Sequence, residues 1–380
     1  MSETAEELSK FAGGQRIIAK HPGINELCDL MDDMKCADLG SILLLAASTR
    51  ALKTTPGEVI SGNHFNVPSE VPQRTFHYVE GLIYDSFPDI NFIELAPTQP
   101  IGTSSILAGT DQKTIMPALR RSEVNSDATT SLFRTVYDEY MQNVHTQPFT
   151  LATNTRVTRI QAFDPKTKFL PHFRMFAQVT VGEEKIQNGP TELETLATHL
   201  ATTVKILNTV AASNRGNISQ LDISIGNILF LEEIIGKGLI SRDEVRRHTQ
   251  DPDYDYIEAT GLDIPSSMSF DNLDLRQDLE NLGFHKGLSV LEGFQHTLEN
   301  LHPDLLSQVR LDLGRIAGIG YYKHLCFKVH AKNSEGVSLP LVDGGTTNWI
   351  RLVEPKNKNH FTVTSGIGTE LLAKYFITQV

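Results

Sequence analysis

Cationic and hydrogen-bonding side chains concentrate in one stretch of this chain, between residues 150 and 181. This group comprises Arg156, Arg159, His172, Arg174 and Gln178, with Phe176 among them. The planar guanidinium of arginine offers several donors to phosphate oxygens, and an aromatic ring provides a stacking surface for a base. The pattern predicts a nucleotide-binding site, although solvated strand arginines and a core phenylalanine would give the same composition.

The elements that carry these side chains are two expected β-strands, at residues 150–160 and 173–181. Between them, Asp164-Pro165-Lys166 is typical of a turn, so the two strands should form an antiparallel hairpin. Because side chains alternate along a strand, we expect Phe176 and Gln178 to share one face of the returning strand.

The order of these residues resembles the second signature motif of class II aminoacyl-tRNA synthetases. The resemblance implies that Arg156 is catalytic and binds the α-phosphate of ATP, and that Arg174 belongs to the same nucleotide site. It also implies that His172 reaches the outer phosphates and that Phe176 stacks on adenine. Gln178 ends a run similar to one found in histidyl-tRNA synthetases, which implies a contact with the bound amino acid.

The last seventy residues resemble the end of a histidyl-tRNA synthetase catalytic domain. They contain a Gly-x-x-Tyr-Tyr segment ending in Tyr321 and Tyr322, a strand with Gly344 and Gly345, and a Gly-Ile-Gly helix start at 366–368. The resemblance implies that these tyrosines and glycines bind the substrate. Since we expect the tyrosines to lie in an apolar strand, only one of them should face the pocket, and the glycines could serve close strand packing instead.

Several positions depart from the family pattern. The arginine that normally precedes the glycine of the tyrosine segment is Ala317, and the arginine of the last helix is Leu371. At two positions where the family has acidic residues, this chain has Thr158 and Gly182. We expect Arg315, about 7 Å upstream of Ala317 on the same strand face, to fill part of the vacated space.

Two further segments agree with the family in order. Residues 92–97 resemble the first signature motif, whose strand ends at a proline, here Pro97, and forms the dimer interface. Residues 119–123, followed by Ala128-Thr129, resemble the segment that holds the substrate ammonium group. By position the ammonium ligand is Glu123, with an internal ion pair as the alternative role.

The expected fold is α+β: a class II synthetase-type antiparallel sheet of six strands, flanked by helices. We expect an N-terminal helical extension and linker at 1–70, a catalytic-like core at 71–231 and 309–380, and a helical insertion with its own small core at 232–308. Within these parts, the apolar spacing predicts helices and strands. Helices are expected at 22–53, 72–87, 114–142 and 191–210, and further strands at 90–95 and 221–228. An anticodon-binding domain is not expected.

Composition limits the classes of function. The chain has 380 residues, a net charge of −12 and an ordinary 40% of hydrophobic residues. A negative net charge argues against extended contact with a phosphate backbone, so tRNA is not an expected partner. Three cysteines without a metal-binding spacing indicate reduced thiols, no metal site and a cytoplasmic location. The longest apolar run is too short to cross a membrane.

Three functions remain open at this point. The first is a histidyl-tRNA synthetase-like paralogue that binds an amino acid or small carboxylate with ATP and Mg²⁺, forming an acyl-adenylate without charging tRNA. If active, it would be an ATP-dependent amino-acid-activating ligase. The second is the non-catalytic regulatory subunit of ATP phosphoribosyltransferase, which would have a catalytic protein partner. The third is a dimeric pseudoenzyme scaffold. The resemblance implies a homodimer in each case.

Overall fold

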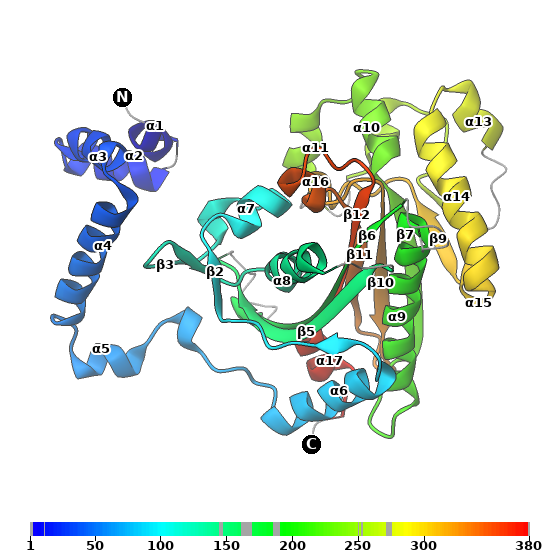
Figure 1. Ribbon diagram of the computed structural model, residues 1–380, viewed down its shortest axis with the longest axis horizontal. Coiled ribbons are helices and arrows are strands. Elements are labelled where there is room, and N and C mark those ends of the chain that lie inside the picture. Colours follow the sequence, from blue (N-terminus) through cyan, green and yellow to red (C-terminus); the bar gives the residue numbers. More distant parts are fainter. Residues whose placement is uncertain are drawn as a thin grey trace.

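The protein is built around one large twisted sheet, seen in the computed structural model in Figure 1. The structure describes residues 3–10, 12–143, 147–160, 169–184, 191–249, 251, 254–270 and 276–378. Within these residues the sheet has nine strands in the order β1-β5-β6-β12-β11-β10-β7-β9-β8. Their bounds in that order are Asn91–Phe92, Phe149–Thr158, His172–Glu183, His360–Ile367, Ser338–Thr347, Leu325–Lys332, Gln220–Asn227, Val309–Asp312 and Ser267–Ser269.

The expected six-stranded antiparallel sheet is the centre of this larger sheet, from β5 to β7. The sheet is mixed because β1 pairs parallel to β5 at one edge and β9 pairs parallel to β7 at the other. The expected strand at 90–95 shrinks to the two residues of β1. The expected turn at 164–168 lies outside the described residues.

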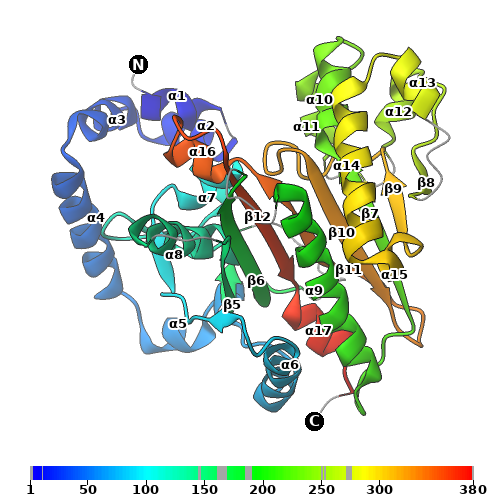
Figure 2. The same cartoon turned by 45° about the vertical axis from the view of Figure 1, so that its right-hand side comes forward.

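Helices cover the two faces of the sheet differently. On the face that we call the back face lie α6 (Gln73–Ser86), α9 (Glu192–Ala212) and α17 (Thr369–Tyr375), which contact one another or the strands. Figure 2 shows α9 crossing this face. On the front face, α8 (Ala128–Gln142) lies inside the curve of the hairpin β5–β6 (Figure 1), near α7 (Thr103–Ala108) and α16 (Trp349–Val353).

The helix expected at 114–142 begins only at Ala128, because the Asp127 side chain caps it by accepting a hydrogen bond from the Thr129 amide. The residues before it form a small second sheet of β2 (Thr98–Pro100), β4 (Ser122–Val124) and β3 (Pro117–Ala118), beside the short turn η2 (Gln112–Thr114). The helices expected at 72–87 and 191–210 are confirmed as α6 and α9.

Residues 232–308 are mostly helical and join the main sheet through β8. Their helices are α10 (Ile228–Gly236), which starts just before this segment, α11 (Arg242–His248), α12 (Tyr256–Thr260), α13 (Arg276–Asn281), α14 (His285–Leu301) and α15 (Pro303–Leu306). Phe284 and Phe294 belong to the same core cluster as Ile223 and Phe327 of the sheet. The separate small core expected here is therefore wrong: α14 packs on α9, which joins both parts in one core.

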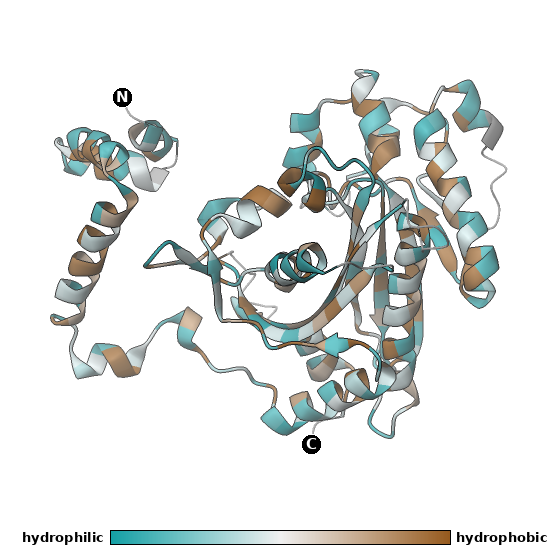
Figure 3. Cartoon of the chain, in the orientation of Figure 1, coloured by the Kyte–Doolittle hydropathy of each residue, from teal (hydrophilic) through white to brown (hydrophobic). Residues whose placement is uncertain are grey.

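The N-terminal helices form an arm at one side of this body (Figure 1), which they contact through an ion pair between Glu7 and Lys113 at 3.6 Å. They are α1 (Glu3–Ser9), α2 (Ala12–Lys20), α3 (Ile24–Asp33), α4 (Cys36–Ala51) and α5 (Pro56–Ser61), followed by the turn η1 (His64–Asn66). Helix α5 lies within the expected linker, because a capping box between Thr55 and Glu58 starts it. Helix α4 has no buried residue, although Figure 3 shows hydrophobic residues along it.

Across the described residues, no helix combines the length and the apolar character that spanning a membrane would require.

Candidate functional site

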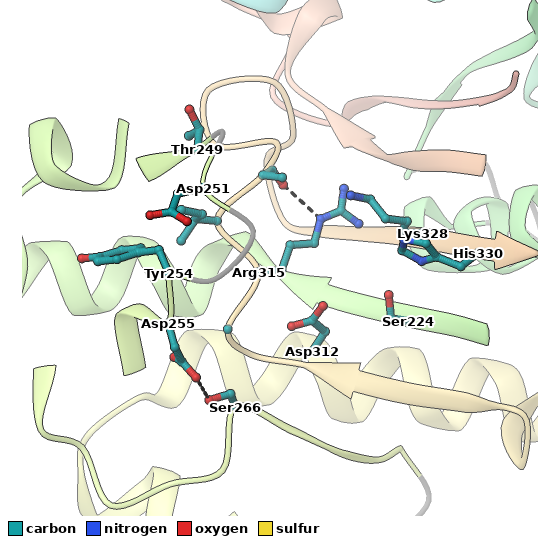
Figure 4. A pocket seen from close by; sticks show the side chains of 13 residues that line it. Ser224, Thr249, Asp251, Tyr254, Asp255, Ser266, Asp312, Arg315, Lys328 and His330 are labelled. Atoms are coloured by element: carbon teal, nitrogen blue, oxygen red, sulfur yellow. Dashed lines mark hydrogen bonds between the residues drawn. The ribbon is translucent and has the colours of Figure 1, made fainter. Parts of the chain in front are cut away.

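A cleft runs along the front face of the sheet, formed by two adjoining cavities that share Thr249 and Lys328. The first cavity, of about 650 Å³, contains Tyr321 and Tyr322, and we call it the tyrosine pocket. The second, of about 610 Å³, contains Arg315, and we call it the arginine pocket (Figure 4). Both volumes are in the range of small-molecule sites.

A tight turn aims both tyrosines into the tyrosine pocket. The amides of Tyr321 and Tyr322 donate to the Gly318 carbonyl, at 3.0 and 2.8 Å. Gly318 and Gly320 have φ values of 100° and 84°, which glycine adopts without strain. The expectation that only one tyrosine would face the pocket is wrong, because these residues form a turn and do not alternate as a strand does.

The two glycines predicted to bind substrate serve packing instead. A Cβ atom on Gly345 would lie 2.6 Å from the Tyr322 ring, and one on Gly344 would lie 2.4 Å from the Phe327 ring. Gly345 therefore makes room for Tyr322 on the front face, while Gly344 makes room for a core ring on the back face. Neither glycine lines the tyrosine pocket.

Two carboxylates accompany the two tyrosines. The Tyr322 hydroxyl donates to Asp343 at 2.7 Å, and the Tyr321 hydroxyl lies 2.5 Å from Thr129 Oγ1 and 3.4 Å from Asp127 Oδ2. Burial, together with these neighbouring carboxylates, raises the pKa of both tyrosines well above the usual range. Both hydroxyls therefore stay protonated and can donate hydrogen bonds.

Arg159 supplies positive charge at the same end of the pocket. Its guanidinium lies 3.6 Å from Asp127 and 5.3 Å from the centroid of the Phe173 ring, and its Nε donates to the Ser126 carbonyl. The rest of the wall is mainly apolar, with Met175 among its side chains. The tyrosine pocket thus combines one polar, charged end with an apolar wall.

Sequence reasoning chose Glu123 for the ammonium contact and missed Asp127. Glu123 is completely buried and accepts hydrogen bonds from Gln99, Gln112 and the Gly102 amide, so it organises the small sheet and does not reach the cleft. Asp127 lines the pocket. Its signal in the sequence is an acidic residue immediately before Ala128-Thr129, at a helix start.

The predicted nucleotide cations lie on the back face of the hairpin, opposite the cleft. Arg156 pairs with Glu370 of α17 at 3.1 Å, and Arg174 pairs with Glu80 of α6. His172 lies 2.8 Å from the Arg156 guanidinium. The structure does not bring these three predicted phosphate ligands to the cleft, because strand alternation points them toward the helices of the back face.

Phe176 and Gln178 also belong to the back face. Phe176 is completely buried, with its ring centroid 6.1 Å from that of Phe92. Gln178 is buried as well, two residues before Thr180 on the same strand face, and Thr180 forms a hydrogen bond with His199 of α9. Adenine has no access to a ring inside the core, so the stacking role predicted for Phe176 is not available in this structure.

The residues of the cleft do not fit ATP and Mg²⁺, which the resemblance implies. The wall of the tyrosine pocket holds Leu371, and that of the arginine pocket holds Ala317, where the family has arginines. In the described residues no group of three or more His, Cys, Asp or Glu side chains could hold a metal ion. Positions 317 and 371 therefore offer no cation to a triphosphate.

Arg315 contacts the backbone at position 317 and the Asp343 carboxylate. Its Nε donates to the Ala317 carbonyl at 3.0 Å, and its Nη2 lies 2.9 Å from Asp343. Burial opposes the charge, but the attraction of Asp343 outweighs it and raises the pKa of Arg315. The guanidinium lines the arginine pocket beside the Ala317 carbonyl, 5.9 Å from the centroid of the Tyr322 ring.

The arrangement of strands and helices is that of a class II synthetase core, and comparison with known structures confirms the resemblance. The chain is similar to an ATP phosphoribosyltransferase regulatory subunit/histidyl-tRNA synthetase from Bacillus halodurans, with a TM-score of 0.60, 15% identity and coverage of 82% of each chain. It is similar to a histidyl-tRNA synthetase from a Nostoc species, with a TM-score of 0.56 and 20% identity over 82% of this chain and 74% of that one.

A third similar structure is the apo histidyl-tRNA synthetase of S. aureus, with a TM-score of 0.53 and 14% identity over 81% of this chain and 72% of that one. No protein-family model and no curated protein sequence matches the chain. At these identities the likeness establishes the fold, and the function must be argued from the site.

Proposed function

We propose that this protein binds a free amino acid in the tyrosine pocket and does not activate it. The observation that carries the proposal is the charge pattern of the cleft. Asp127, Asp343 and Arg159 surround the two tyrosine hydroxyls, while Arg156 and Arg174, which the family resemblance assigned to a nucleotide, lie on the other face of the sheet. A zwitterion matches this set, because its ammonium group needs carboxylates and its carboxylate needs a guanidinium.

The expected contacts are few and strong. Asp127 is partly buried, with its side chain 14% exposed, so a hydrogen bond from an ammonium group to it is worth about 1.5–3 kcal/mol. Arg159 is 37% exposed and could turn from Asp127 toward a ligand carboxylate. The apolar wall of Phe173, Met175 and Leu371 would contact the ligand side chain.

Formation of an acyl-adenylate is disfavoured by the residues at positions 317 and 371 and by the pairing of Arg156 with Glu370. This reaction develops negative charge on the α-phosphate and on the departing pyrophosphate, which preorganised cations must stabilise. Removal of one such group typically costs about 3 kcal/mol, roughly a hundredfold in rate. Ala317 and Leu371 remove two, and Arg156 is held by Glu370.

The regulatory role follows from combining amino-acid binding with the loss of chemistry. One similar structure bears the name of an ATP phosphoribosyltransferase regulatory subunit. We therefore propose that this chain is a homodimeric, cytoplasmic subunit of that kind, which reports amino-acid binding to a catalytic ATP phosphoribosyltransferase. L-Histidine is the first ligand to test.

A thermal-shift screen of the twenty amino acids, each with and without ATP and Mg²⁺, tests the proposal. A ligand at a hundred times its Kd should raise the free energy of unfolding by about 2.7 kcal/mol and the melting temperature by several degrees. We expect a shift with one amino acid that ATP does not enlarge. Asp127→Asn should abolish it, and Asp138→Asn, at an exposed position of α8, should not.

Other outcomes would favour the alternatives. A shift that grows with ATP, accompanied by amino-acid-dependent exchange of pyrophosphate into ATP, would contradict the proposal and favour an adenylating enzyme. No shift with any amino acid would favour a dimeric scaffold.

A further inference from the structure

The arginine pocket, next to the proposed amino-acid site, contains two cations that the proposed function does not use, Arg315 and Lys328, beside the carboxylates of Asp251, Asp255 and Asp312. Figure 4 shows Arg315 and Lys328 pointing toward one another above the strands β7 and β10. Ser224 and His330, on the same two strands, line the cavity beside them. A carboxylate or phosphate group placed between these two side chains would be attracted by both.

Arg315 has a donor that nothing in the described chain satisfies. Its side chain is 4% exposed, and its Nε and Nη2 bind the Ala317 carbonyl and Asp343. No atom of the described residues accepts a hydrogen bond from Nη1. The buried His330 Nδ1 is also without a partner in the described part of the chain. Buried donors of this kind are normally satisfied, and leaving one unpaired costs about 1–3 kcal/mol.

The acidic groups of the same cavity already have partners. Asp255 accepts from Ser266 and from the Ile257 amide at the start of α12. Asp312 lies 3.8 Å from Arg310 on its own strand, and Asp251 lies 3.5 Å from His248. Lys328, in contrast, forms no ion pair with any described residue of the chain. Asp312 interacts electrostatically with both Lys328 and Arg315, so among the described residues the groups of this cavity that still lack a direct partner are the Lys328 ammonium and the Arg315 Nη1 donor.

The fold makes specific room for this arginine. A Cβ atom on Gly226 would lie 2.7 Å from Arg315 Cδ and 3.1 Å from the Cys326 sulfur. A larger residue at 226 would push the guanidinium away from the strands. The glycine, the buried arginine and the strand lysine thus form one structural unit.

We propose that the arginine pocket is an anion-binding subsite, which holds a carboxylate or phosphate group between Arg315 Nη1 and Lys328 Nζ. This subsite rests on the proposed function in one respect, the identity of the ligand. Because the two cavities adjoin, one ligand can place its ammonium group in the tyrosine pocket and a second, anionic group in the arginine pocket. The ligand class is a small zwitterion or metabolite with an additional carboxylate or phosphate.

Calorimetric titration of the full chain with inorganic phosphate and with malonate, at constant ionic strength set by chloride, tests the subsite. We expect saturable binding of at least one of the two. Binding of phosphate alone assigns a phosphate-bearing ligand, and binding of malonate alone assigns a carboxylate-bearing one.

Two variants locate the binding. Lys328→Gln should weaken it by about 10-fold to 100-fold, the factor expected for one charge-assisted hydrogen bond. Arg315→Lys keeps a charge for Asp343 but removes the unpaired donor, and should weaken binding similarly. The matched control is Lys332→Gln, at the exposed end of the same strand, which should leave binding unchanged.

The subsite is overturned if neither anion binds, or if Lys328→Gln and Arg315→Lys both bind as tightly as the wild type. Because the probes contain no ammonium group, they test the arginine pocket without the tyrosine pocket. Failure of the subsite would therefore leave amino-acid binding in the tyrosine pocket intact, and Asp127→Asn should not change the titration.

Discussion

Each face of the hairpin β5–β6 presents an arginine close to an aromatic ring. On the back face, Arg156 lies 5.7 Å from the centroid of Phe76, and on the front face Arg159 lies 5.3 Å from that of Phe173. The back-face arginine is held among helices, while the front-face arginine borders a cavity. Residue type alone therefore does not distinguish an arginine that can bind a ligand from one that joins secondary structures. The face of the strand on which the arginine lies makes that distinction.

The back-face network joins distant parts of the chain. Glu370 of α17 accepts from Ser69, from the Arg174 amide and from Arg156, and His172 reaches the Val67 carbonyl. These bonds tie the segment before α6 to the last helix. The residues that the family resemblance assigned to ATP thus hold the two ends of the core together.

The largest effect should follow from removal of Glu370. Glu370→Ala leaves Arg156 and the Arg174 amide without their acceptor, so we expect the free energy of unfolding to fall by about 3 kcal/mol. Urea denaturation measures this change. Glu299→Ala, in an exposed pair with His296, should change stability by less than about 0.5 kcal/mol. Equal effects of the two variants would refute the structural role of the back face.

Replacement of each hairpin arginine by alanine should affect the two faces differently. We expect Arg159→Ala to weaken binding of L-histidine, or of the amino acid that the screen identifies, by about 10-fold to 100-fold. Arg156→Ala should lower stability and leave the affinity unchanged. Calorimetric titration of the two variants measures the affinity. A loss of affinity in Arg156→Ala would show that the ligand binds at the back face, which would contradict the proposed site.

The back face also predicts a pH dependence. His199 lies between Thr180 and Ser365, and burial lowers its pKa to about 3. As the pH falls from 7 to 5, the unfolded chain takes up a proton that the folded chain does not, so stability should fall by about 2 kcal/mol through this group. His199→Gln should lose that part of the pH dependence. A variant with an unchanged pH profile would show that His199 takes up a proton as readily in the folded chain as in the unfolded chain.

The smallest effect is expected on the front face. Tyr321→Phe removes one hydroxyl that contacts Thr129 and Asp127, so it should cost about 1 kcal/mol of stability. Tyr84→Phe, at a partly exposed tyrosine of α6, is the control and should be close to neutral. If both variants unfold at the same urea concentration as the wild type, the Tyr321 contacts contribute nothing to the fold.

Local patterns were sufficient for much of the fold. Alternation predicted the hairpin, and apolar spacing predicted α6 and α9, because these elements bury one face along a continuous segment. The predicted helix start at residue 114 was wrong because the Asp127 cap begins the helix at Ala128. The edge strands β8 and β9 were missed because each is short and gains its partner from a distant part of the chain.

The candidate site was harder to predict. Tyr321 and Tyr322 were found from their spacing with Gly318, but the assignment of Glu123 missed its neighbour Asp127 by four residues. The hairpin residues were assigned to the face opposite the cleft. A shift of one residue along a strand moves every side chain to the other face, and a motif resemblance does not fix that register.

The amino-acid sequence was enough to fix the central strands and main helices, the tyrosine pair with its glycines, and the absence of arginine at positions 317 and 371. These are properties of single residues and short segments. The three-dimensional packing was needed to show which arginines border a cavity, which pair with a carboxylate, and that the Arg315 Nη1 has no acceptor among the described residues. Those outcomes depend on how strands from distant segments align, since that alignment sets both the face of each side chain and the neighbours that it meets.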